Sequence, residues 1–127
     1  MGQQQLLLII LGVIIVGIAI AVGLSLFSAQ SVQSNRDAII NDLNNLAAQA
    51  YQFRIRPTSM GGGQGDYTTF AIPTKMKTNE NATYSSSPTT NSIVFTAISA
   101  QNASNSVTVT IDSNGRLGGW SYYGDFQ

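Results

Sequence analysis

Residues 6–27 read LLLIILGVIIVGIAIAVGLSLF. This stretch is apolar apart from Gly12, Gly17, Gly23 and Ser25. A helix needs about 20 apolar residues to cross the hydrocarbon core of a bilayer. The stretch is therefore long enough to span a membrane as a helix.

The next segment, residues 28–53, reads SAQSVQSNRDAIINDLNNLAAQAYQF and contains neither proline nor glycine. Its apolar residues recur at spacings of four and three, which is the pattern of an amphipathic helix. Pro57 disfavours helical geometry at the residue before it. The two segments together predict one unbroken helix from about Gln3 to about Ile55, apolar all round in its first half and apolar on one side in its second.

An ordinary secretory signal peptide is a poor fit to this start. Such a signal begins with basic residues, has an apolar core of about 7–15 residues and ends at a small-residue cleavage site. Here the first basic residue is Arg36, the apolar run is longer, and no such site follows Phe27. We therefore expect the apolar segment to be a membrane span or an assembly element.

The small residues of the apolar segment allow two interpretations. Glycine is generally more frequent in transmembrane helices than in soluble ones. Gly17 with Ala21, and Ala19 with Gly23, are also pairs of small residues four apart, which allow neighbouring helices to approach closely. The second interpretation predicts helix packing.

Composition removes several classes of function. Six basic and six acidic residues cancel, and only 9% of positions are charged, against a typical ~25%. A basic patch for nucleic acid is therefore not expected. The chain has no cysteine and no histidine, which excludes disulfides, thiolate metal sites and Ser-His or Cys-His catalysis. We expect no enzyme activity, no metal and no cofactor.

The remainder of the chain predicts a small sheet. TSMGGGQGDY, beginning at Thr58, carries four glycines and indicates a flexible connection. Runs at 67–72, 92–99 and 106–111 are rich in β-branched and aromatic residues, and RLGGWSYY (116–123) follows a DSNG turn. The polar segment 73–91 is predicted to be a surface excursion. The expected core comprises Ile39, Leu43, Leu46, Ala50, Phe53, Phe70, Ile72, Val94, Ile98, Val107, Val109, Ile111, Leu117 and Trp120.

The predicted fold class is α+β, with a long N-terminal helix packed on a small antiparallel sheet of about four strands. Residues 1–27 form the apolar membrane or polymerisation half of the helix. Residues 28–127 form a globular domain: the second half of the helix (28–55), the glycine-rich loop (57–66) and the sheet (67–127).

With this architecture, the whole chain resembles the type IV pilins and their pseudopilin relatives. The resemblance implies a subunit held in the inner (cytoplasmic) membrane until pilus assembly machinery extracts it. It then implies a helical homopolymer at the cell surface, with the apolar half-helices bundled in its centre and exposed loops serving adhesion or motility. It also implies a prepilin peptidase that cuts behind a glycine, and methylation of the first mature residue.

The N-terminal motif departs from the family pattern, in which a basic leader precedes the glycine and the fifth mature residue is glutamate. If cutting follows Gly2, the leader lacks a basic residue and Leu7 takes the glutamate position. If Met1 is the first mature residue, Gln5 takes that position as a neutral isostere. The presence of Met1 favours this second arrangement or a lineage that does not cut.

Glutamines at the helix start can satisfy one another and the free amide groups of the first turn across subunits, or can simply lie at the membrane interface. The predicted polymerisation surface therefore comprises Met1, Gln3, Gln4, Gln5, Leu6, Gly12, Gly17, Ala19, Ala21 and Gly23.

Two asparagines match the N-x-S/T pattern of N-glycosylation acceptors: Asn81 before Thr83, and Asn102 before Ser104. Both lie in expected loops, and matches by chance are also expected in a chain so rich in asparagine and hydroxyl residues.

A structural subunit of an extracellular type IV pilus-like filament is the leading interpretation of this sequence. One alternative is a small binding module tethered to a membrane by a single helix. Another is a pseudopilin that forms at most a short fibre in a secretion or uptake machine.

Overall fold

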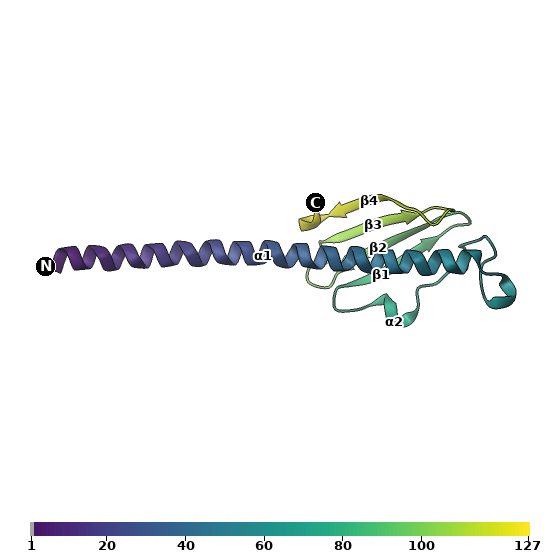
Figure 1. Cartoon of the computed structure of the whole chain (residues 1–127), viewed down its shortest axis with the longest axis horizontal. Coiled ribbons are helices and arrows are strands. Elements are labelled where there is room, and N and C mark those ends of the chain that lie inside the picture. The colour runs from purple at the N-terminus through teal and green to yellow at the C-terminus, as the bar shows by residue number, and fades with distance from the viewer. Residues whose placement is uncertain (1) are drawn as a thin grey trace. The chain divides into compact units, whose positions relative to one another are not determined.

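The computed structural model describes residues 2–127 and contains two α-helices and one four-stranded sheet (Figure 1). The chain divides into two compact units, Met1–Gln33 and Ser34–Gln127, which are described separately. Met1, expected on the polymerisation surface, lies outside the described residues. The elements are α1 (Gly2–Ile55), α2 (Thr74–Lys77), β1 (Ala82–Pro88), β2 (Ile93–Ser99), β3 (Ser106–Ile111) and β4 (Leu117–Tyr123), with 3-10 turns at Thr58–Met60 and Gly124–Phe126.

Helix α1 is continuous from Gly2 to Ile55, which confirms the prediction of one unbroken helix. It contains no proline to remove a backbone hydrogen bond. It ends two residues before Pro57, as the sequence predicted.

The glycine-rich loop after α1, expected to be a flexible connection, is hydrogen-bonded to the end of the helix. Its amides fold back on the helix end: Gly63 N–H donates to the carbonyl of Phe53 (2.8 Å), and Gln64 N–H donates to that of Arg56 (3.0 Å). A Cβ at Gly63 would lie 1.9 Å from the backbone oxygen of Asp66. Glycine is needed here for close backbone approach, and the loop satisfies carbonyls that the last helical turn leaves free.

The sheet is an antiparallel meander in the order β1-β2-β3-β4, as predicted. The turn between β3 and β4 has Gly115 at φ +81°. In the same turn, the Asp112 carboxylate accepts hydrogen bonds from the N–H groups of Asn114 and Arg116, both at 2.9 Å. This is the side-chain turn chemistry expected of aspartate before glycine.

Two strand assignments from the sequence were wrong. The 67–72 run is not a strand, because Asp66 accepts the Thr68 N–H and the Phe70 N–H bonds back to the Tyr67 carbonyl, which turns the chain. Its place in the sheet is taken by β1, which lies within the expected surface excursion at 73–91. β1 is an edge strand, and its proline is the last residue, where a missing N–H is tolerated.

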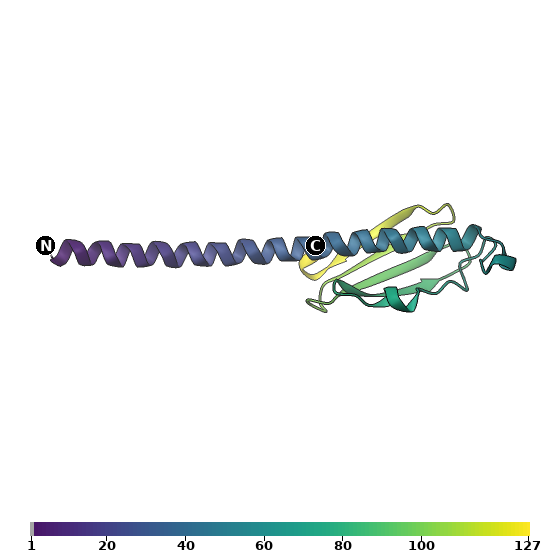
Figure 2. The ribbon, with the colours of Figure 1, turned by 60° about the horizontal axis from the view of Figure 1, so that its bottom comes forward.

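The globular unit has two layers, with residues 34–55 of α1 running along one face of the sheet (Figure 2). The predicted helix stripe is buried at four of its positions, and Phe53 is half-buried. Phe53 packs edge-on against Phe70, whose ring in turn meets Phe95 at 6.2 Å. The confirmed core residues are Ile39, Leu43, Leu46, Ala50, Phe70, Ile72, Val107, Val109 and Ile111.

The predicted core was wrong in β2. Val94 and Ile98 are 39% and 42% exposed on the outer face, whereas Ile93, Phe95 and Ala97 are fully buried. Both sets are apolar, so alternation alone does not choose between them. Turning the face with Ile93, Phe95 and Ala97 inward buries the Phe95 ring, and so removes more apolar surface from water than burying Val94 and Ile98 would. Leu117 and Trp120, also expected in the core, are half-buried on the edge strand β4.

The outer face of the sheet is made of hydroxyl and apolar side chains. Thr96, at its centre, lies opposite Ser85 on β1 and Thr108 on β3. None of the four strands carries an acidic or basic residue.

Candidate functional site

The apolar segment of α1 exposes all its large side chains within the described chain. Those from Leu6 to Phe27 are between 52% and 73% exposed. Within the described residues, α1 is the one helix long and apolar enough to cross a membrane, as judged by length and composition. Fully burying one such side chain contributes roughly 1.5–3 kcal/mol. A surface of this kind is stable only when lipid or protein covers it.

The small residues of this segment fall on two opposite sides of α1. Successive residues are rotated by about 100° in a helix, which places Gly17 and Ala21 on one side and Gly12, Ala19 and Gly23 about 160° away. A Cβ added at any of the three glycines would meet nothing within 4 Å. The segment is exposed on every side, so the small side chains alone distinguish these two sides, and each contains one of the predicted small-residue pairs.

The three glutamines and Leu6 occupy the first turns of α1 and are exposed. By the same rotation, Gln3 lies on the Gly17 side and Gln5 on the Gly23 side, with Gln4 between them. Each small-residue side therefore has an amide side chain at its N-terminal end, which can donate and accept hydrogen bonds.

A buried polar network at the start of the globular unit was not predicted. Asn35 is 5% exposed; its Nδ2 donates to the Asn81 carbonyl (3.0 Å), and its Oδ1 accepts from the Ser99 hydroxyl (2.6 Å). Asn35 precedes Ile39 by four residues, so it occupies a position of the buried stripe. A polar residue in that register was the signal available in the sequence.

A second cluster surrounds Asp42 on the same helix. Its carboxylate accepts hydrogen bonds from Asn79 Nδ2 (2.9 Å), Asn81 Nδ2 (3.2 Å) and the Tyr84 hydroxyl (2.5 Å). Burial alone would raise the pKa of Asp42, but these three bonds together hold it below its usual value. Burial, with the neighbouring carboxylate, raises the pKa of Tyr84. The cluster fixes the segment before β1 against α1.

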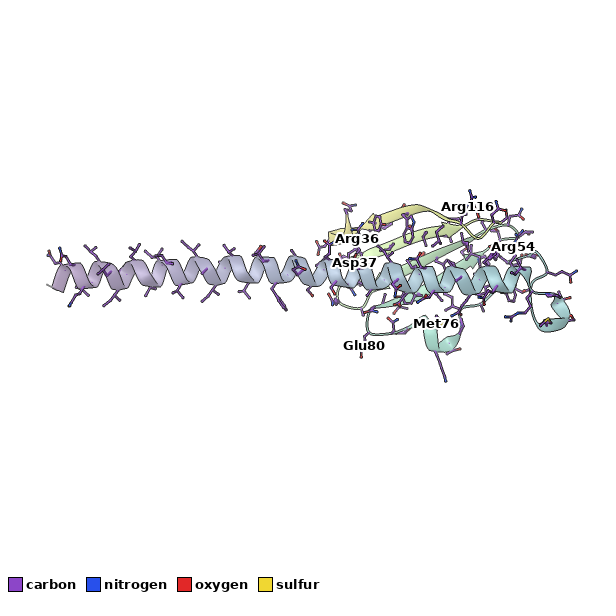
Figure 3. The ribbon with its side chains drawn as sticks, viewed as in Figure 1. Arg36, Asp37, Arg54, Met76, Glu80 and Arg116 are labelled. Atoms are coloured by element: carbon purple, nitrogen blue, oxygen red, sulfur yellow. The ribbon has the colours of Figure 1, made fainter. Side chains whose placement is uncertain are left out.

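Two arginines of α1, labelled in Figure 3, lie against aromatic rings of the globular unit. The Arg36 guanidinium is 4.3 Å from the ring centroid of Tyr122, which stacks on Trp120. Arg54 lies over Tyr67 and donates to the carbonyl of Ser113. These contacts anchor both ends of the 34–55 part of α1.

The two N-x-S/T asparagines have different surroundings. Asn81 is half-buried and belongs to both polar networks. Asn102 is exposed in the loop between β2 and β3.

No group of three or more His, Cys, Asp or Glu side chains that could hold a metal ion occurs within residues 2–127. Comparisons with protein-family models, with curated proteins and with solved structures found no match to this chain.

Proposed function

We propose that this chain is the structural subunit of an extracellular filament of the type IV pilus kind, which polymerises through the apolar segment of α1. Before assembly the same segment would hold the subunit in the cytoplasmic membrane. Pilus assembly machinery, and in a processed lineage a prepilin peptidase, would then act on it.

One observation carries this proposal: the apolar segment offers close-packing surfaces on two opposite sides. A tether needs only a span of sufficient length and apolar character. A helix in the centre of a filament must contact neighbours on more than one side, and small residues on each side permit close approach. Gly17 with Ala21, and Gly12 with Ala19 and Gly23, meet that requirement.

The continuity of α1 supports the same function. Its second half supplies core residues of the globular unit, among them Ile39 and Leu43. Bundling the first halves of many copies would therefore carry a folded domain with each helix. The uncharged start of the segment avoids the cost of burying an unpaired glutamate in an apolar bundle.

The test is a double substitution, Gly17→Leu with Ala21→Leu, in cells that make the protein. Leucine would fill the open space on one side while keeping the segment apolar. We expect the filaments sheared from the cells to disappear from negative-stain micrographs and the subunit to remain in the membrane fraction. Ile18→Leu with Val22→Leu, which lies between the two small-residue sides at the same spacing, is the matched control and should leave filaments intact.

The membrane-tethered binding module uses the segment as a span only. It therefore predicts no filament in the wild type, and unchanged membrane retention and ligand binding in the double variant. Filaments that persist at wild-type amount in the double variant would refute the proposal. So would the absence of any filament containing this chain in the wild type. A short-fibre pseudopilin would be sensitive to the double variant but would yield no long filaments on shearing.

A further inference from the structure

The side-chain amide of Asn81 is occupied by the fold. Its Nδ2 donates to Asp42, its backbone N–H donates to Asn79 Oδ1 (2.8 Å), and its carbonyl accepts from Asn35 and from the Ala100 N–H (3.0 Å). The next residue, Ala82, is fully buried and begins β1. An enzyme that binds this segment as an acceptor peptide would have to break the hydrogen-bond networks around Asn35 and Asp42 and unpair the start of β1.

The side-chain amide of Asn102 is presented to solvent. Residues 101–104 are all exposed, and Asn102 Oδ1 accepts the Ser104 N–H at 3.0 Å. Within the described chain, Nδ2 of Asn102 has no hydrogen-bond partner. This Asx-type turn engages only the amide oxygen and leaves the nitrogen of an exposed side chain free, two residues before the serine that completes the acceptor pattern.

From this difference we infer that Asn102 is the attachment site of an N-linked glycan and that Asn81 is not. The donor class is an oligosaccharide whose anomeric carbon is bonded to a lipid phosphate or diphosphate, used by a membrane-bound glycosyltransferase. A chain with a span-length apolar segment meets such a donor at the same membrane.

The transfer is a substitution at the anomeric carbon without oxidation or reduction. Asn102 Nδ2 forms the new carbon–nitrogen bond, and the bond from the anomeric carbon to the phosphate oxygen breaks. The lipid phosphate leaves with that electron pair, and one Nδ2 proton passes to a base of the transferase. In the Asx turn the hydrogen bond is made by Oδ1 of Asn102, so neither Nδ2 proton is used in a hydrogen bond within the described chain.

The first test is mass spectrometry of the full chain from the cells that make it. We expect a sugar mass on the peptide containing Asn102 and only bare Asn81. Asn102→Gln and Ser104→Ala should each remove the mass, while Ser104→Thr should retain it. Thr83→Ala destroys the other acceptor pattern at an exposed side chain, so it is the matched control and should change nothing.

A second test uses the purified full chain in detergent, an N-x-S/T-specific oligosaccharyltransferase and a lipid-linked oligosaccharide. The folded chain should gain one glycan, and the urea-unfolded chain should gain two. An Asn102 peptide found only unmodified in the native cells would overturn the inference, and so would a glycan on Asn81 of the folded chain. Filaments should persist in Ser104→Ala, so failure of this inference and failure of the proposed function are separate results.

Discussion

Phe95→Ala tests the packing of the sheet against α1 most directly. The Phe95 ring is fully buried, lies opposite Val109 and meets the Phe70 ring edge-on at 6.2 Å. Removing a buried phenylalanine side chain costs about 3–5 kcal/mol, from lost transfer free energy plus the cavity. A domain of this size has about 5–15 kcal/mol of total stability and loses roughly 4–8 °C of melting temperature per kcal/mol. We therefore expect the melting temperature of the globular unit to fall by at least about 12 °C.

Val94→Ala is the matched control, because Val94 neighbours Phe95 on the same strand but faces outward. Its side chain is 39% exposed, so its truncation should cost less than about 1 kcal/mol. Thermal and urea unfolding of the full chain in detergent can be followed by fluorescence of Trp120, the single tryptophan, which lies on β4. Equal losses in the two variants, or a larger loss in Val94→Ala, would show that the strand faces are assigned the wrong way round.

Two further predictions concern the globular unit. The pKa of Asp42 lies below its ordinary 3.8, so its ionised form stabilises the fold above that pH and this contribution is lost as the pH falls through the folded-state pKa. Asp42→Asn should therefore unfold at a lower urea concentration than wild type at pH 7, and the difference between the two midpoints should narrow as the pH falls below 3.8. A difference independent of pH would contradict the assignment. Gly115→Ala forces a side chain at φ +81° and places its Cβ 2.7 Å from the Tyr51 ring, so it should destabilise by more than about 1 kcal/mol. Gly118→Ala, with nothing within 4 Å, should stay within about 0.5 kcal/mol of wild type in the same urea titration.

The helix and its stripe could be predicted from the sequence because their signals are long and agree with one another. Three signals indicate the same helix, α1. No proline occurs before Ile55, apolar residues such as Ile39 and Leu43 recur at helical spacing, and Pro57 follows the helix end. The β3 segment was equally clear, since Val107, Val109 and Ile111 alternate with hydroxyl residues.

Short segments without such agreement misled the prediction. Residues 67–72 have strand composition, yet the Asp66 side chain competes for the backbone amide of Thr68 and turns the chain. β1 has little strand signal beyond Thr83 and Tyr84, because an edge strand rich in serine buries few side chains. In β2 both faces are apolar, so the choice of face depends on packing against Phe70, which local pattern does not contain.

The candidate site also has one feature that the sequence predicted and one that it did not. The small-residue pairs were visible as spacing, and the helix adds that they lie on opposite sides. The difference between Asn81 and Asn102 was invisible in the sequence, since both fit the same pattern. It arises from long-range partners: Asp42 and Asn35 engage Asn81 from a helix more than 35 residues away in the chain.

The sheet built from strands without acidic or basic residues has an electrostatic consequence. Salt weakens contacts between exposed charges by screening, with a Debye length of about 8 Å at physiological ionic strength. The outer face formed by Thr96, Thr108 and their neighbours carries no formal charge to be screened. Adsorption or lateral contact through this face should therefore be nearly independent of ionic strength, in dilute fresh water as in brine.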